Sequence, residues 1–143
     1  MANTTSGGLL LALKARIEAL TPAAKFHPDD AYRVGIGSRV AFQGNRTVLL
    51  SCAPGRRIQG GRTCSDWETV IAIQAFYVDN PGMYEVACDD AEQIANELYD
   101  WVASAAGQTL GLLQVEPELA NIAGDEGELE VSRFARFLYR GLP

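Results

Sequence analysis

The fold is decided by residues 67–78, WETVIAIQAFYV. β-Branched and aromatic residues dominate this stretch, which contains no Gly or Pro. On a strand, Ile71 and Ile73 would point to one face, and Val70 and Phe76 would point to the other. A strand that is apolar on both faces is typical of the centre of a sheet. We therefore expect one face to lie under helices, and the other to be covered by more of the same chain or by a partner subunit.

The length and composition fit one compact domain. The chain has 143 residues, of which 48% are hydrophobic and 21% are charged. These values allow a sizeable core, so we expect residues 1–143 to form a single domain. The net charge of -6 argues against a protein that grips nucleic acid phosphates over a broad surface.

The part of the chain before the central strand predicts one helix and several short strands. Residues 1–8 are small and polar, and we expect them to form a flexible lead-in. A helix is expected from residue 8 to about residue 20, because Leu10, Leu13 and Ile17 recur at helical spacing. Extended segments are expected at residues 32–36, 39–42 and 46–53, with a turn at residues 43–45.

After the central strand, the sequence predicts a turn and then the strongest helix. Residues 79–82, DNPG, favour a turn. Asp89 is expected to cap the helix and Glu92 to complete its N-terminus, while the charge of Asp90 favours the same end of the helix dipole. Gly107 is expected to end the helix. Its apolar stripe consists of Ile94, Leu98, Trp101, Val102 and Ala105.

A closing β-hairpin is expected after this helix. Residues 110–119 predict a strand that Pro117 places at an edge, and residues 124–127 predict an acidic turn. Residues 128–140 predict a last long strand with apolar residues in both phases. The whole order predicts an α+β fold, a mixed or antiparallel β-sheet with two main helices packed on one side.

Residues 54–65 depart from the acidic character of the chain. We expect a long protruding β-hairpin arm with a mobile basic loop here, because Arg56, Arg57 and Arg62 lie among Gly and Pro residues, and Arg46 flanks them in the sequence. The plainer interpretation is a solvated loop. A cationic arm could also reach toward an acidic partner subunit or toward DNA passing nearby.

The sequence offers little for catalysis or metal binding. It contains no GxSxG, HExxH, Walker or GxGxxG motif. Cys52, Cys64 and Cys88 have no CxxC spacing, and His27 is the single histidine, so we expect no metal, no cofactor and free thiols. A bridge between Cys52 and Cys64 would need an oxidising compartment. A small enzyme that uses one of these two thiols with His27 remains a rival hypothesis.

The first residues show neither a signal peptide nor a membrane span. They lack a positively charged region, and the apolar run of residues 9–13 stops at Lys14. We therefore expect folding in a cytoplasm and no contact with a membrane.

The order of these segments resembles that of the tail terminator (tail completion) proteins of long-tailed bacteriophages. The resemblance runs from about Leu9 to Arg140, and short phage neck and minor tail proteins share parts of the pattern. The segments that carry it are the helix LLLALKARIEAL, the extended region, the strand WETVIAIQAFYV, the helix DDAEQIANELYDWVA, and the closing pair LGLLQVEP and GELEVSRFARFLYR.

The resemblance implies a structural virion protein without catalytic residues, assembled in the cytoplasm of the bacterial host. In that family a homohexameric ring caps the tail tube, stops its polymerisation and offers a docking surface for the head connector. The implied partners are other copies of the chain, the tail tube protein and the head–tail connector or stopper protein. DNA that passes through the ring lumen is a further candidate partner.

We take as candidate interaction residues the cations and the aromatic side chain that a neighbour could contact. The two long strands with apolar residues in both phases agree with a ring in which another copy covers the second face. Rivals from other classes are a different neck or head–tail joining protein and a DNA-binding accessory protein that acts through the arginine arm. The candidate residues are Arg46, Arg56, Arg57, Arg62, Trp67 and Arg133.

Overall fold

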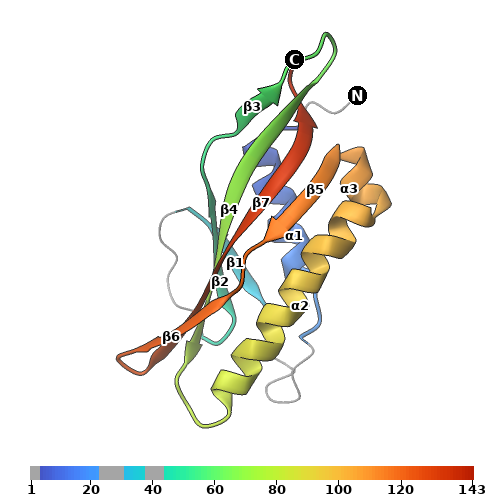
Figure 1. The fold of residues 1–143 in the computed structure, drawn as a ribbon. Helices are drawn as coiled ribbons and strands as arrows, with labels where there is room; N and C mark the ends of the chain where they lie inside the picture. Colours follow the sequence, from blue (N-terminus) through green and yellow to red (C-terminus); the bar gives the residue numbers. More distant parts are fainter. Residues whose placement is uncertain (1–3, 23–30, 38–43) are drawn as a thin grey trace.

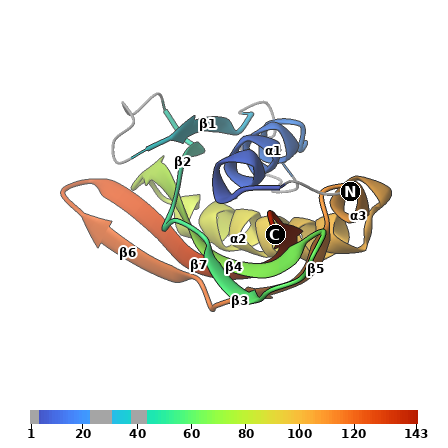
Figure 2. The same ribbon diagram turned by 90° about the horizontal axis from the view of Figure 1, so that it is seen from above.

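The computed structural model describes residues 4–22, 31–37 and 44–143, and it confirms the α+β class. A seven-stranded mixed sheet carries α1 and α2 on one side, as Figure 1 and Figure 2 show. In chain order the elements are α1 (Ser6–Glu18), β1 (Arg33–Ile36), β2 (Thr47–Cys52), β3 (Arg56–Gln59), β4 (Ser65–Val78), α2 (Met83–Ala103), α3 (Ala105–Thr109), β5 (Leu112–Pro117), β6 (Asn121–Asp125) and β7 (Glu128–Gly141).

The expected central strand is confirmed as β4. The strands lie in the order β1-β2-β4-β7-β5, with β3 beside β4 and β6 beside β7. β1 and β2 are parallel, and the other pairs are antiparallel. β4 and β7 pair without a register shift from Ser65↔Gly141 to Val78↔Glu128. β5 lies at an edge, as expected from Pro117.

The helix-covered face of the sheet holds the core. One face of β4 lies under helices, as predicted, and it is the phase that contains Ile71, Ile73 and Tyr77. Trp101 of α2 is also buried, and its ring meets that of Phe137 edge to face with centroids 5.7 Å apart. Aromatic pairs in this geometry add to the stabilisation from buried area. α1 completes the core with Leu9, Leu10, Leu13 and Ile17.

The opposite face of the sheet is not covered by any helix or strand in the described part of the chain (Figure 2). The pairing Ala72↔Phe134 lies near its middle, and Phe134 is 54% exposed. Residues directly opposite each other on paired strands point to the same face, which fixes the members of this surface. We call it the open face: Glu68, Val70, Ala72, Gln74, Phe76 and Val78 of β4 with Glu128, Glu130, Ser132, Phe134, Arg136 and Leu138 of β7.

Both long helices begin earlier than predicted. α1 starts at Ser6, where the side chain of Thr5 accepts a hydrogen bond from the Gly8 N–H, so the expected lead-in is shorter. Residues 1–3 lie outside the described residues. α2 starts at Met83 directly after the predicted turn, because Gly82 takes the left-handed conformation with φ of 85°.

The expected capping role of Asp89 is therefore wrong, since Asp89 lies inside α2. Gly107 also does not end this helix. α2 stops at Ala103, and Ser104 caps the short helix α3, in which Gly107 lies. The acidic pair at residues 89–90 resembled a helix start only because both positions carry carboxylates.

Two expectations about strands need correction. The protruding arm with a mobile loop is not confirmed, because Arg56–Gln59 form β3 and pair with β4 at Asp66, Trp67 and Glu68. β6 was not predicted, since Asn121–Asp125 contains one large apolar residue, Ile122, and no alternating pattern. The strand expected at residues 39–42 lies outside the described residues.

Candidate functional site

Among the predicted interaction residues, Arg56, Arg57 and Trp67 lie together where β3 pairs with β4, whereas Arg46 and Arg133 lie elsewhere on the sheet. Arg56 and Arg57 lie on β3, where all side chains are exposed, and Arg62 lies in the turn that leads to β4. Arg56 Nη2 lies 3.1 Å from Glu68 Oε1, yet the Arg56 side chain is 76% exposed, so this pair contributes little to stability. Among the described residues, Arg57 and Arg62 have no carboxylate within ion-pair distance. The hairpin end of the sheet thus carries free positive charge.

A chain of charges extends from this end along the open face. Glu68 Oε2 lies 4.0 Å from Arg136 Nε, and Arg136 Nη1 lies 3.6 Å from Glu116 Oε2. The residue that follows Leu138 and Tyr139 on β7 is Arg140, which is exposed. Glu68, Arg136 and Glu116 thus form a connected set of ion pairs, whereas Arg57, Arg62 and Arg140 have no carboxylate within ion-pair distance among the described residues.

The other end of the open face is acidic. A groove of about 220 Å³ opens there between the ends of β4, β6 and β7. Gln74 Nε2 donates a hydrogen bond of 2.7 Å to Glu130 Oε1, while Asp125, Glu126 and Glu128 form no ion pair among the described residues. The groove is lined by Phe76, Ala123, Asp125, Glu126, Glu128 and Glu130.

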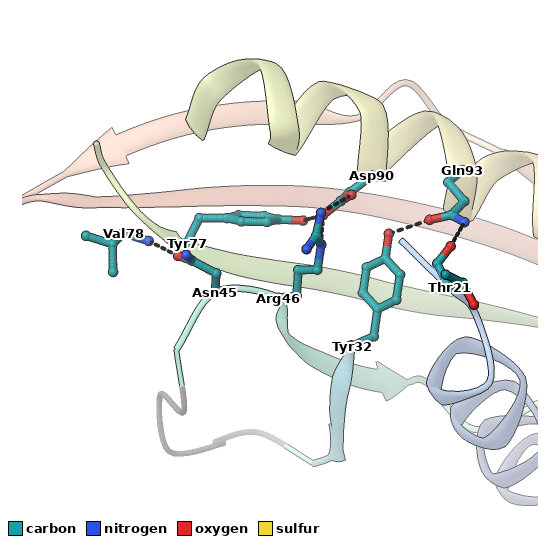
Figure 3. Close-up of polar contacts among 8 residues, drawn as sticks. All are labelled: Thr21, Tyr32, Asn45, Arg46, Tyr77, Val78, Asp90 and Gln93. Carbon is teal, nitrogen blue, oxygen red and sulfur yellow. Dashed lines mark hydrogen bonds and ion pairs between the residues drawn. The ribbon is translucent and has the colours of Figure 1, made fainter. Parts of the chain in front are cut away.

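Arg46 was predicted to contact a partner, and the structure shows that this is wrong. Its side chain is 0% exposed and forms two contacts with Asp90 of α2 (Figure 3). Arg46 Nε donates to Asp90 Oδ2 at 2.7 Å, and Nη2 donates to Oδ1 at 3.2 Å. Tyr77 donates its hydroxyl proton to Asp90 Oδ2 at 2.8 Å. A guanidinium buried in this way cannot reach another molecule.

The surroundings of Arg46 join distant parts of the chain. The guanidinium lies over the ring of Tyr32, 5.8 Å from its centroid, and the Tyr32 hydroxyl donates to Gln93 Oε1 at 2.8 Å. Burial, with the nearby charge of Asp90, raises the pKa of Tyr32 and the pKa of Tyr77 above their ordinary values. Both phenols therefore stay neutral donors, and the cluster holds the start of β2 against α2.

Sequence reasoning missed the role of Asp90, although a signal was present. Asp90 is in the same helical phase as Ile94, Leu98 and Trp101, all of which are buried. A carboxylate on the buried side of a helix needs a cation or several donors. Arg46, with φ of 64°, supplies that cation from the turn before β2.

Trp67 and Arg133 are less accessible than a surface role would require. The half-buried Trp67 donates its indole N–H to the carbonyl of Leu142 at 2.8 Å, beside a small cavity of about 90 Å³. Arg133 points to the helix-covered face between Val131 and Ala135, and burial lowers its pKa. Trp67 lies directly opposite Arg57 on β3, whereas Arg133 pairs with Ile73 nearer the middle of β4.

The thiols show no sign of joint chemistry. Cys52, Cys64 and Cys88 are all free and half-buried. Burial raises the pKa of Cys88, which disfavours its reactive thiolate form. His27 lies outside the described residues, so the structure does not place it relative to any cysteine.

Three further findings concern metal binding, membrane crossing and similarity to known proteins. In the described ranges, no group of His, Cys, Asp and Glu side chains is arranged to bind a metal ion. None of the helices in these ranges has the length and apolar character needed to cross a bilayer. No model of a known protein family matches the chain, and no curated protein matches it.

Proposed function

We propose that this chain is a tail terminator of a long-tailed bacteriophage, a structural protein that forms a ring on the tail tube. The observation that carries the proposal is the open face, where Phe134, Val70 and Leu138 lie on a sheet with no cover on that side from the described chain. The order of elements also resembles that family. A sheet face with this apolar content favours burial against another protein.

The physical requirement for such a ring is a pair of unlike surfaces on each copy. Contacts between two different surfaces, repeated by a rotation that closes, produce a ring in place of an open filament. The chain has unlike ends along the β4–β7 ladder, a basic hairpin at Arg57 and Arg62 and an acidic groove at Asp125 and Glu128. This polarity suits repeated contacts between copies.

In the proposed role, other copies of the chain, a tail tube protein and a head–tail connector are the partners. The ring ends the growth of the tube and presents its far side to the connector, and DNA would pass through the lumen. Each step depends on protein–protein docking and requires no bond-making chemistry. A related neck or head–tail joining role would use the same surfaces with different neighbours.

Electron microscopy of particles that lack the protein tests this proposal. The expected result is tails of uncontrolled length without attached capsids, and purified protein added to growing tubes should stop their elongation. Tails of normal length on normal particles would refute the terminator role. Abnormal attachment with normal tail length would instead favour another neck protein.

A second candidate is a DNA-binding accessory protein, which the exposed and unpaired Arg57 and Arg62 favour. Each arginine that contacts a phosphate releases counterions, so binding to duplex DNA should weaken steeply with salt. Replacement of Arg56, Arg57 and Arg62 by Ala should abolish such binding. If the native chain shows no salt-dependent binding to duplex DNA, this candidate is wrong.

Substitution of the candidate catalytic residues distinguishes a cysteine-dependent enzyme from the tail terminator and from the DNA-binding protein. Replacing His27, Cys52 or Cys64 by Ala should leave ring formation and tail length unchanged if the protein is a terminator. A Cys64→Ala variant that is as stable as the native chain but fails to assemble would contradict this expectation.

A further inference from the structure

Two groups of opposite charge, each without an ion-pair partner among the described residues, lie at opposite ends of the β4–β7 ladder. We call the first group the basic hairpin, which consists of Arg57, Ile58 and Arg62, all exposed on β3 and the following turn. We call the second group the acidic groove, which consists of Phe76, Ala123, Asp125, Glu126, Glu128 and Glu130. Arg56 is not included because Glu68 already pairs with it.

One chain cannot bring these two surfaces together. The basic hairpin is fixed to β4 at Asp66 through the pairing of β3, while the groove begins at Phe76 on the same strand. Ten residues of strand at about 3.3 Å each separate these positions by about 33 Å. Figure 1 shows β3 and the β6–β7 turn at opposite ends of the long β4–β7 pair. Only a second molecule can therefore join the opposite charges.

We propose that the acidic groove of one copy binds the basic hairpin of a second copy of this chain. The groove offers the carboxylates of Asp125, Glu126 and Glu128, which form no ion pair within the described chain. The guanidinium groups of Arg57 and Arg62 are the matching donors, and hydrogen bonds between such charged groups are stronger than neutral ones.

The apolar parts of the two surfaces also match. Ile58 lies between Arg57 and Gln59 and is 50% exposed, so it offers apolar surface beside the hairpin arginines. Phe76 lies in the acidic groove and forms part of the open face. Contact between Ile58 and Phe76 would remove apolar surface from water at the centre of the charged contact, where ion pairs gain most from reduced solvent.

The contact uses two different surfaces of each copy, so every copy has one free hairpin and one free groove until the ring closes. That the contacts close into a ring rests on the proposed function, whereas the contact between two copies rests on the basic hairpin and the acidic groove. Each contact would also bring a neighbour to the acidic end of the open face, next to Phe76 and Val78. This gives the uncovered apolar sheet a partial cover.

Charge reversal on separate variants tests the contact. A hairpin variant carries Arg57→Glu and Arg62→Glu, and a groove variant carries Asp125→Lys and Glu128→Lys. A control variant carries Glu92→Lys and Asp100→Lys, which change net charge as the groove variant does but lie exposed on α2. Sedimentation at increasing protein concentration measures association, and circular dichroism verifies that each variant is folded.

The native chain and the control variant are expected to form assemblies of more than two copies. The hairpin variant alone and the groove variant alone should associate at least tenfold more weakly. An equimolar mixture should recover assembly, because the reversed hairpin of one variant meets the reversed groove of the other.

Four outcomes would overturn the inference: a native chain that stays monomeric at every concentration, a groove variant that assembles like the native chain, a mixture that does not recover assembly, or assembly that stops at two copies.

Addition of each sample to growing tail tubes separates this inference from the proposed function. Recovered assembly that never stops tube growth would refute the terminator role and leave the contact standing. Native protein that stops tube growth, together with a groove variant that does so equally well, would refute the contact alone.

Discussion

Removal of the Asp90 carboxylate should have the largest effect of any single polar substitution in the described chain. The variant Asp90→Ala removes the carboxylate that pairs with the buried guanidinium of Arg46 and accepts the hydrogen bond of the Tyr77 hydroxyl. Breaking a buried ion pair by removing one partner costs about 3–5 kcal/mol, because a charge stays buried and uncompensated. The unfolding free energy of a domain is about 5–15 kcal/mol, so the variant should fold with a much reduced margin.

Urea unfolding followed by circular dichroism measures this loss. The urea concentration at the midpoint should fall strongly, with little change in how steeply the unfolding free energy depends on urea. The melting temperature should fall by about 10 °C or more. The matched control is the double variant Arg46→Met with Asp90→Leu, in which no charge remains buried. Replacing both partners by apolar residues is often close to neutral, so the double variant should be more stable than Asp90→Ala.

This comparison can refute the reasoning in two ways. A loss below about 1 kcal/mol for Asp90→Ala would mean that Arg46 finds water or another partner and that burial does not hold it in place. A double variant that is less stable than the single variant would mean that the ion pair is net stabilising here. In that case, the ion pair itself adds to the unfolding free energy, besides linking α2 to the start of β2.

The remaining predictions concern a glycine, a phenol and the open face. Gly107→Ala should destabilise the protein by more than about 1 kcal/mol, because a Cβ at this position would collide with the Trp101 carbonyl. Gly7→Ala in α1 has room for a Cβ and should stabilise the protein by about 0.5–1 kcal/mol, which thermal unfolding measures. Burial raises the pKa of Tyr77 above its unfolded value of about 10, so its stabilising contribution is complete below that pH and is lost as the pH rises beyond it. The unfolding free energy should fall with alkaline pH, and less steeply in Tyr77→Phe. Phe134→Ser should change the unfolding free energy by less than about 1 kcal/mol, because the ring is half exposed. The variant should nevertheless associate more weakly than the native chain in sedimentation. Equal association of variant and native chain would exclude the open face from the contact between copies.

Local pattern predicted most of the sheet correctly. β4 and β7 were predicted because long stretches are rich in β-branched and aromatic residues, but apolar residues in both phases left open that the buried phase is the one with Ile71 and Phe137. The turn before α2 was recognised from Asn80 and Pro81, although the helix begins directly after it. The start of a helix depends on which conformation one residue such as Gly82 takes, and that choice is settled by tertiary packing.

The features that sequence could not predict depend on contacts between distant residues. The parallel pairing of β1 with β2 and the ion pair between Arg46 and Asp90 join segments with no common local pattern. β6 contains little apolar sequence and is held by its partner β7. Arg46 flanks the basic hairpin in the sequence, but β2 begins opposite Phe76 whereas β3 pairs with β4 near Asp66, so the two lie toward different ends of β4.

The uninterrupted pairing of β4 with β7 also determines how the molecule would respond to force. The ladder continues from Ser65↔Gly141 to Val78↔Glu128 without a bulge. A pull along the strands would load its hydrogen bonds in shear, all at the same time, whereas a pull across them at Val78 would open the ladder one bond after another. The protein should therefore resist tension along the sheet far better than peeling at the acidic end, and optical-trap experiments with handles in the two directions would measure the difference.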